Sequence, residues 1–169
     1  MDGITLEQLL RAREERAARQ QALIAQWRLP LVSFTVNMPG PEKLSGRSRY
    51  IFTCGCAAIS RALGDKVAYH EQRELISGPE GFYLVKMEPS ELKKAMCAIE
   101  DATELGRLYD IDVIGPSGPI SRESAGFEMR RCLLCNMPGA ACARSRTHSI
   151  SELINAIDGI ISRSKGESL

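Results

Sequence analysis

Apolar residues recur at helical intervals in four parts of the chain, which predicts helices over residues 5–28, 48–63, 90–102 and 149–163. Two of these segments begin with a capping box, Thr5 with Gln8 and Ser149 with Glu152, in which side chains bond the free amides of the first turn. Gly64 follows the second segment, and glycine readily takes the left-handed conformation that ends many helices. The pattern therefore predicts a helix near each end of the chain.

Both terminal helices are predicted to be amphipathic. In the first helix the residues expected to face the core are Leu6, Leu9, Leu10, Ala17, Ile24 and Trp27. On or beside its other face lie Arg11, Arg13, Arg16 and Arg19. Exposure to solvent is the default expectation for these arginines, and a phosphate site is the alternative. In the last helix the expected inner residues are Ile150, Leu153, Ile154, Ile157 and Ile160, and residues 162–169 are expected to fray.

Between the helices, β-branched and apolar runs predict strands over residues 31–36, 67–76, 82–87, 108–114 and 119–121. The glycine- and proline-rich segments 77–81 and 115–118 are predicted turns, so that the strands beside them form hairpins. Residues 124–148 show no clear period and are expected to form a loop-rich insertion. Because helices and strands do not alternate strictly, the order favours an α+β fold with a mixed or antiparallel sheet flanked by helices.

Length, composition and charge narrow the class of protein. The 169 residues fit one domain over residues 1–169, and 44% hydrophobic with 25% charged residues excludes a disordered chain. No apolar run of membrane-spanning length occurs, and the start lacks the basic and apolar regions of a secretory signal, so a cytoplasmic location is expected. The net charge of +1 argues against a general nucleic-acid binder.

Asp110 and Asp112 are the first candidates for chemistry. They are two residues apart in a predicted strand, so their carboxylates share a face while Ile111 and Val113 point to the core. Neighbouring carboxylates repel unless a cation lies between them, and Mg²⁺ binds carboxylate and phosphate oxygens together. The pair therefore indicates a magnesium site for phosphoryl or nucleotidyl transfer, with Arg107 placed to contact a phosphate. A solvated acidic edge strand is the alternative, and the chain contains no Walker A motif.

A second candidate site combines three cysteines and a histidine, in the spacing Cys132-x2-Cys135-x6-Cys142-x5-His148. Thiolates and an imidazole suit tetrahedral zinc, and four protein ligands close the site, which is typical of a structural role. Three reduced, partly buried thiols beside an unligated His148 are an equally open interpretation. A nucleophilic cysteine, activated by nearby arginines, is the weakest of the three.

Several blocks of the chain together resemble one family, the apo-citrate lyase phosphoribosyl-dephospho-CoA transferases, also called citrate lyase holo-acyl-carrier-protein synthases. The likeness spans residues 5–160. The blocks are Arg-Glu-Glu-Arg-Ala-Ala-Arg-Gln (13–20), Leu-Val-Ser-Phe-Thr-Val-Asn-Met-Pro-Gly-Pro (31–41), Gly-Arg-Leu-Tyr-Asp-Ile-Asp-Val (106–113), Arg-Arg-Cys-Leu-Leu-Cys (130–135) and Cys-Ala-Arg-Ser-Arg-Thr-His (142–148). The acidic strand is also similar to that of nucleotidyltransferase folds, whose usual Gly-Ser helix start before the acidic pair is missing here.

The resemblance implies that the chain attaches the phosphoribosyl-dephospho-CoA part of 2′-(5″-triphosphoribosyl)-3′-dephospho-CoA to a serine of the apo acyl carrier (gamma) subunit of citrate lyase, with release of diphosphate. For such a reaction we assign Asp110 and Asp112 to Mg²⁺, and either of them to the serine proton. The residues expected to contact the phosphates are Arg107, Arg131, Arg144, Arg146 and Arg16. The Cys/His group would brace the arginine-bearing loop. The alternatives are a non-catalytic, zinc-stabilised module that binds a carrier protein or nucleic acid, and a cysteine-based acyl transferase.

Overall fold

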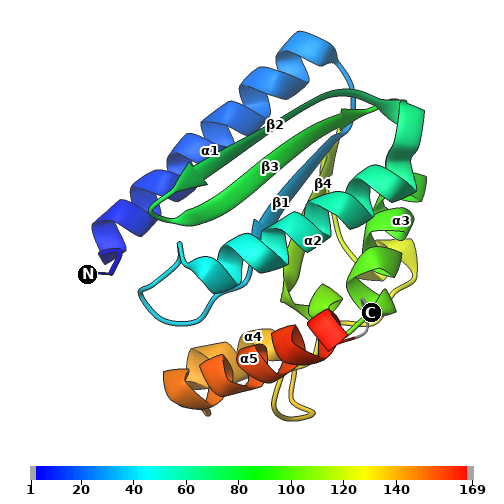
Figure 1. Ribbon diagram of the computed structural model, residues 1–169. Helices are drawn as coiled ribbons and strands as arrows, with labels where there is room; N and C mark the ends of the chain where they lie inside the picture. The colour runs from blue at the N-terminus through cyan, green and yellow to red at the C-terminus, as the bar shows by residue number, and fades with distance from the viewer. Residues whose placement is uncertain (1–2, 167–169) are drawn as a thin grey trace.

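A computed structural model describes residues 3–166 of the chain (Figure 1). Its centre is a five-stranded sheet in the order β2-β3-β1-β4-β5, in which every pairing is antiparallel. The strands are β1 (Leu31–Val36), β2 (Val67–Leu75), β3 (Gly78–Val85), β4 (Tyr109–Gly115) and β5 (Gly118–Ile120). The predicted α+β class is confirmed, and of the two predicted sheet types the antiparallel one is found.

The described residues form five α-helices: α1 (Leu6–Trp27), α2 (Gly46–Leu63), α3 (Pro89–Ala102), α4 (Gly139–Ser145) and α5 (Ile150–Gly166). Both predicted capping boxes are present, since Thr5 and Gln8 bond each other's backbone amide, as do Ser149 and Glu152. The short helix α4 was not predicted. Helix α5 continues through the segment expected to fray as far as Gly166, and residues 167–169 lie outside the described part of the chain. None of the helices between residues 3 and 166 has the length and apolar character needed to cross a membrane.

Helices cover the two faces of the sheet unequally (Figure 1). Helices α2, α3 and α5 pack on one face and enclose the larger apolar core with side chains such as Phe34, Ile111 and Val113. Helix α2 lies very close to the sheet at Gly55. A Cβ atom at this position would lie 2.2 Å from Cζ of Phe34. Within residues 3–166, α1 is the one helix on the other face, where Leu23 packs in a smaller apolar cluster that includes Phe82.

The predicted inner face of α1 is wrong in part. Leu6 and Leu10 are 72% and 48% exposed, whereas Ala12 and Leu23 are buried. Arg16 and Arg19, expected in solvent, turn toward the sheet and bond glutamates there. The reason is that the sheet surface beneath α1 is itself polar in its middle, which the periodicity of α1 alone does not reveal. At the other end of the chain, Ile150 of α5 is also exposed, although it was predicted to be buried.

The first predicted hairpin turn was placed too late in the chain. Residues 77–81 were expected to form the turn, but only Ile76 and Ser77 do so, and β3 begins at Gly78. The backbone of Gly78 has φ +108°, which residues other than glycine rarely adopt. Glycine at this position therefore allows a two-residue turn. Glu80 consequently lies inside the sheet and is 1% exposed. This shift places a buried carboxylate where the sequence suggested an exposed one.

Residues 122–149 form a Cys/His lobe that connects β5 to α5 and contains α4. An isolated bridge between Arg131 and Pro138 gives the lobe its own small hairpin-like loop. Arginines fasten it to the body of the protein: Arg107 donates to the carbonyl oxygen of Cys132 at 2.9 Å, and Arg130 donates to those of Tyr109 and Arg107 at 2.6 Å each. The predicted loop-rich insertion is thus attached directly to the start of β4.

Candidate active site

Asp110 and Asp112 lie on the face of β4 that points away from the main core. Their intervening neighbours face the core, as the alternation predicted. Across β1, Ser33 is paired with Asp112 and Thr35 with Asp110, so that these four side chains share one face. The Thr35 hydroxyl donates to Oδ2 of Asp110 at 3.4 Å. The two carboxylates are exposed beside hydroxyl groups rather than apolar side chains, which is the setting of a polar ligand site.

The electrostatics of this pair are unfavourable in the absence of a bound cation. Although Asp112 reaches solvent, the surrounding protein desolvates it, and this desolvation together with the charge of Asp110 raises the pKa of Asp112. The positive charges of Lys93, Arg16 and Arg130 act in the opposite direction without reversing the shift. A divalent cation between the carboxylates would remove the repulsion, so the residues present fit a hard metal ion.

Two buried charges from α3 hold the outer edge of β4 beside the pair. Lys93 donates through Nζ to the carbonyl oxygen of Ile111 at 3.0 Å, and Oε1 of Glu100 accepts the amide of Ile111 at 3.0 Å. The side chains of Lys93 and Glu100 are 5% and 3% exposed. They take the place of a neighbouring strand, because β5 pairs only with the end of β4 from Val113 onward. The backbone between Asp110 and Asp112 is therefore fixed from both sides.

Glu100 also forms ion pairs with two arginines at this edge. Arg122 contacts Oε2 of Glu100 at 2.5 Å and Asp101 at 2.8 Å, while Arg130 reaches Oε1 of Glu100 at 3.4 Å. Burial raises the pKa of Glu100 despite these cations, which shows how strongly its carboxylate is desolvated. The arrangement joins α3, β4 and the Cys/His lobe through one carboxylate.

A cavity of about 300 Å³ opens at this junction. It is lined by Lys93, Glu100, Asp110, Ile111, Asp112, Pro119, Ile120, Ser121, Arg122 and Arg130. The acidic pair and the cations of α3 and the lobe thus face a common space. Cations beside a carboxylate pair suit a polyphosphate bound together with a metal ion.

The cysteines and histidine of the lobe come together as the spacing predicted. The ligand atoms of Cys132, Cys135, Cys142 and His148 all lie within 4.8 Å of one another. Sγ of Cys135 is 3.9 Å from Sγ of Cys142 and 3.4 Å from Nε2 of His148. In a tetrahedral zinc site, bond lengths of about 2.3 Å to sulfur and about 2.0 Å to nitrogen separate such ligands by about 3.5–3.8 Å. The two distances from Cys135 are close to these values, so the cluster can close around a metal ion.

The cluster also stabilises a thiolate. Burial raises the pKa of the Cys132 thiol, but the backbone amides of Leu134 and Cys135 and the neighbouring thiols outweigh burial and lower that pKa to about 6. The amide of Leu134 lies 3.4 Å from Sγ of Cys132. Because metals bind the deprotonated thiol, the lowered pKa favours binding of a metal by Cys132 at neutral pH.

Comparison with known proteins decides the family. A family model described as apo-citrate lyase phosphoribosyl-dephospho-CoA transferase matches residues 4–164. Proteins with that name from Escherichia coli O1:K1 / APEC and from Shigella boydii serotype 18 (strain CDC 3083-94 / BS512) are each 42% identical to this chain over 164 residues, covering 94% of this chain and 89% of the relative. The chain belongs to the apo-citrate lyase phosphoribosyl-dephospho-CoA transferase family.

In this member of the transferase family, one of the five arginines predicted to contact phosphates lies near the acidic pair, and the other four lie elsewhere. Arg16 approaches the acidic pair from α1, as its effect on Asp112 indicates. Arg107 does not line the cavity; it donates a hydrogen bond to the carbonyl oxygen of Cys132 and so attaches the lobe. The remaining three, Arg131, Arg144 and Arg146, are exposed on the lobe and do not line the cavity either. Contact between these arginines and a phosphate stays a prediction.

Sequence reasoning missed Lys93, Glu100, Arg122 and Arg130 in this family member. One signal was available: Lys93 and Glu100 are seven residues apart in a helix whose inner face otherwise carries Leu92, Met96 and Cys97. Charged residues on an apolar helical face need buried partners, and a search for such partners would have pointed to the strand beside α3.

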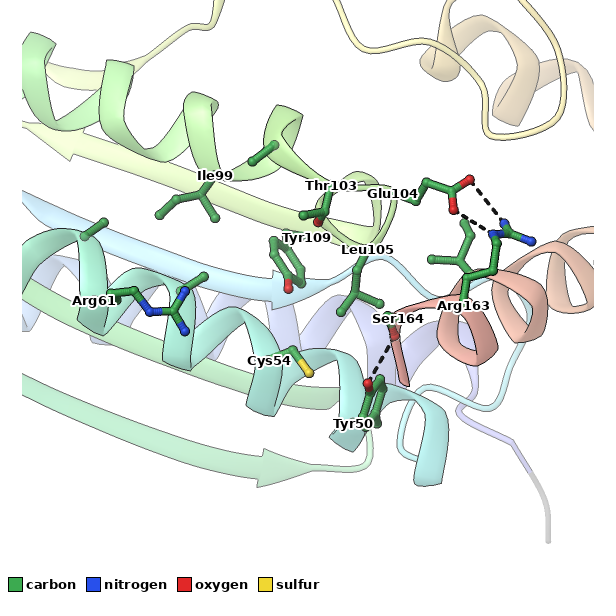
Figure 2. Close-up of a pocket in the computed structure, with 14 residues that line it drawn as sticks. Tyr50, Cys54, Arg61, Ile99, Thr103, Glu104, Leu105, Tyr109, Arg163 and Ser164 are labelled. Carbon is green, nitrogen blue, oxygen red and sulfur yellow. Dashed lines mark hydrogen bonds and ion pairs between the residues drawn. The ribbon is translucent and has the colours of Figure 1, made fainter. Parts of the chain in front are cut away.

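A larger cavity of about 750 Å³ lies on the opposite side of the sheet, between α2, α3 and α5 (Figure 2). Figure 2 shows Tyr109 and Cys54 pointing into it, with the Tyr50 hydroxyl bonded to Ser164 and Glu104 paired with Arg163 at its margin. Tyr109 and Asp110 are neighbours in β4 and face opposite sides of the sheet. The cavity is therefore separate from the acidic pair of the transferase.

Proposed function

We propose that this chain transfers the phosphoribosyl-dephospho-CoA group from 2′-(5″-triphosphoribosyl)-3′-dephospho-CoA to a serine of the apo acyl carrier (gamma) subunit of citrate lyase. The serine hydroxyl oxygen attacks the α-phosphorus of the triphosphate, a new O–P bond forms, and the bond from that phosphorus to the β-phosphate oxygen breaks. Diphosphate leaves, and the serine proton passes to a base. The observation that carries the proposal is the carboxylate pair of Asp110 and Asp112 facing a cation-lined cavity.

The roles of the residues follow from their positions. Asp110 and Asp112 would hold Mg²⁺, which supplies positive charge to the phosphate oxygens when it is bound. One of the two carboxylates accepts the serine proton. Arg16 lies near the pair and neutralises the polyphosphate, while Lys93 and Glu100 keep the intervening backbone in place. Such preorganised charge is the main contribution that a protein makes to phosphoryl transfer.

We further propose that the Cys/His lobe binds one structural zinc ion through Cys132, Cys135, Cys142 and His148. Two observations support it: the distances from Cys135 to Cys142 and to His148 are close to those of a tetrahedral site, and the Cys132 thiol has a lowered pKa. The ion would keep the lobe folded, and with it Arg130 at the start of β4. A cytoplasmic location belongs to the same proposal, since a reducing compartment keeps these thiols available for a metal.

Mass spectrometry of the apo carrier subunit tests the proposed reaction. After incubation with the triphosphoribosyl donor, Mg²⁺ and this protein, one serine of the carrier should gain the mass of the phosphoribosyl-dephospho-CoA group. Asp110→Asn should abolish the gain while the circular dichroism spectrum stays unchanged, because the residue is exposed. The matched control is Asp65→Asn, an exposed carboxylate outside the cavity, which should leave transfer intact. An unmodified carrier with the unaltered protein would refute the proposal.

A further inference from the structure

A buried carboxylate on β3 binds two arginines that come from different elements. Glu80 is 1% exposed, and its Oε2 accepts Nε of Arg16 from α1 at 2.7 Å. Its Oε1 accepts Nε of Arg73 from β2 at 2.9 Å and also contacts NH2 of Arg73. One negative charge thus holds two positive charges, and the group keeps a net charge of +1. A surplus of positive charge at a partly buried site favours an anion.

Glu80 holds both guanidinium groups in place but leaves some of their N–H donors available. Among residues 3–166, Arg16 bonds only through Nε, which leaves both of its terminal nitrogens without a hydrogen-bond partner, and Arg73 has no partner for NH1. The side chains of Arg16 and Arg73 are 23% and 32% exposed. An arginine that is fixed through one edge can present its remaining donors to two oxygens of a phosphate.

The strand register connects this group to the acidic pair. Arg73 is paired with Glu80, Glu80 with Thr35 and Thr35 with Asp110, so that the four residues form one row across the sheet. From β3 to β4 the row covers two strand spacings, or about 10 Å. Arg16 of α1 is held over this row by its 2.7 Å bond to Glu80. A single polyphosphate can therefore extend from the acidic pair to the arginines.

We propose that Arg16 and Arg73 form the subsite for the diphosphate portion of the donor, the part that leaves, and that Glu80 is a positioning residue which aims both guanidinium groups. The inference rests on the proposed function, because it names the part of the donor that this surface binds. It adds Arg73 and Glu80 to the site and gives the anion a class, an inorganic or organic diphosphate.

The chain contains a matched control for this idea. Arg19 lies one helical turn after Arg16 on α1 and also pairs with a glutamate of the sheet, Glu71 of β2. Here the pair is bidentate, with Nε and NH2 of Arg19 at 2.7 and 2.6 Å from the two carboxylate oxygens. The carboxylate of Glu71 on β2 is three strand spacings from Asp112, in the row through Phe82 and Ser33, whereas that of Glu80 on β3 is two spacings from Asp110. This second pair attaches α1 to the sheet and has no surplus charge.

Titration calorimetry with inorganic diphosphate and Mg²⁺ tests the subsite without requiring turnover. Arg16→Lys and Arg73→Lys keep the charge and remove the paired donors, and each should weaken diphosphate binding about tenfold or more, with a matching rise in the KM for the donor and none in the KM for the carrier. Arg19→Lys should bind diphosphate like the unaltered protein. Equal affinities in all of these proteins would overturn the subsite. A carrier left unmodified by the unaltered protein would instead overturn the transfer reaction.

The Glu80→Gln variant distinguishes two roles of Glu80: orienting the guanidinium groups of Arg16 and Arg73, or only neutralising part of their charge. If Glu80 only reduced the positive charge, its replacement by the neutral isostere would strengthen diphosphate binding; if Glu80 aims the arginines, binding weakens. We expect weaker binding, with Glu71→Gln unchanged. Thermal unfolding of each variant checks that it is folded at the temperature of the titration. Tighter binding of diphosphate by folded Glu80→Gln would contradict the positioning role.

Discussion

Replacing Glu100 by alanine should destabilise the fold strongly, because one buried amide and two partly buried arginines depend on its carboxylate. The change leaves the amide of Ile111 without a partner and removes the shared anion from Arg122 and Arg130, whose side chains are 12% and 29% exposed. Breaking a buried ion pair costs about 3–5 kcal/mol, and an unsatisfied buried amide about 1–3 kcal/mol. Arg122 keeps Asp101, and Arg130 keeps its two carbonyl partners, so we expect a loss near the lower end, about 3 kcal/mol.

The matched control is Glu104→Ala. Glu104 pairs with Arg163 at 2.7 Å, but the two side chains are 57% and 56% exposed, and pairs of this kind contribute at most about 1 kcal/mol. Urea unfolding followed by circular dichroism at pH 7 measures both variants. Because burial raises the pKa of Glu100, its ionised carboxylate is itself costly, and the predicted loss comes from the groups left unpaired. Equal stabilities of the Glu100→Ala and Glu104→Ala proteins would show that this network does not hold β4.

The other predictions concern repulsion, packing, pH and metal. Asp112→Asn should raise the urea midpoint, because it removes a carboxylate that the fold disfavours, and should lower the transfer rate at least about a hundredfold. Gly55→Ala should lower stability by about 1–3 kcal/mol, measured by urea unfolding, because its Cβ would overlap Phe34. Arg19 lowers the pKa of Glu71 to about 2, so Glu71→Gln should cost about 1 kcal/mol at pH 7 after allowance for exposure, and the difference should fade as pH drops from about 4.5 toward 2. Atomic emission spectroscopy should find about one zinc ion per chain, and removal of the ion by a chelator should speed trypsin cleavage after Arg144 and Arg146. A zinc-free protein whose lobe resists trypsin equally well would refute the structural ion.

Much of the local structure was predictable because it depends on near neighbours. Capping boxes depend on residues three apart, so the starts of both terminal helices were predicted correctly from Thr5 and Ser149. The common face of Asp110 and Asp112 follows from the alternation of any strand. The Cys/His set was likewise visible from its spacing. In each case the information lies within one short segment.

The composition of the site was less predictable because it depends on which elements meet. Glu80 was assigned to a turn, since glycine and proline around it resemble a loop, and only the two-residue hairpin carries it into β3. Lys93 and Glu100 are ordinary helix residues until α3 packs against the free edge of β4. Local periodicity contains no information about the element on the other side of a contact.

By itself, then, the sequence determined the four longer helices, the order of the strands, the common face of the two acidic residues and the family. Only the tertiary structure decided the direction in which the arginines of α1 point. A helix can direct Arg16 into solvent or onto a sheet with equal local geometry, and the choice depends on whether the surface beneath it offers a carboxylate. Glu80 offers one because β3 brings it under α1, and that pairing of distant segments is a property of the folded chain alone.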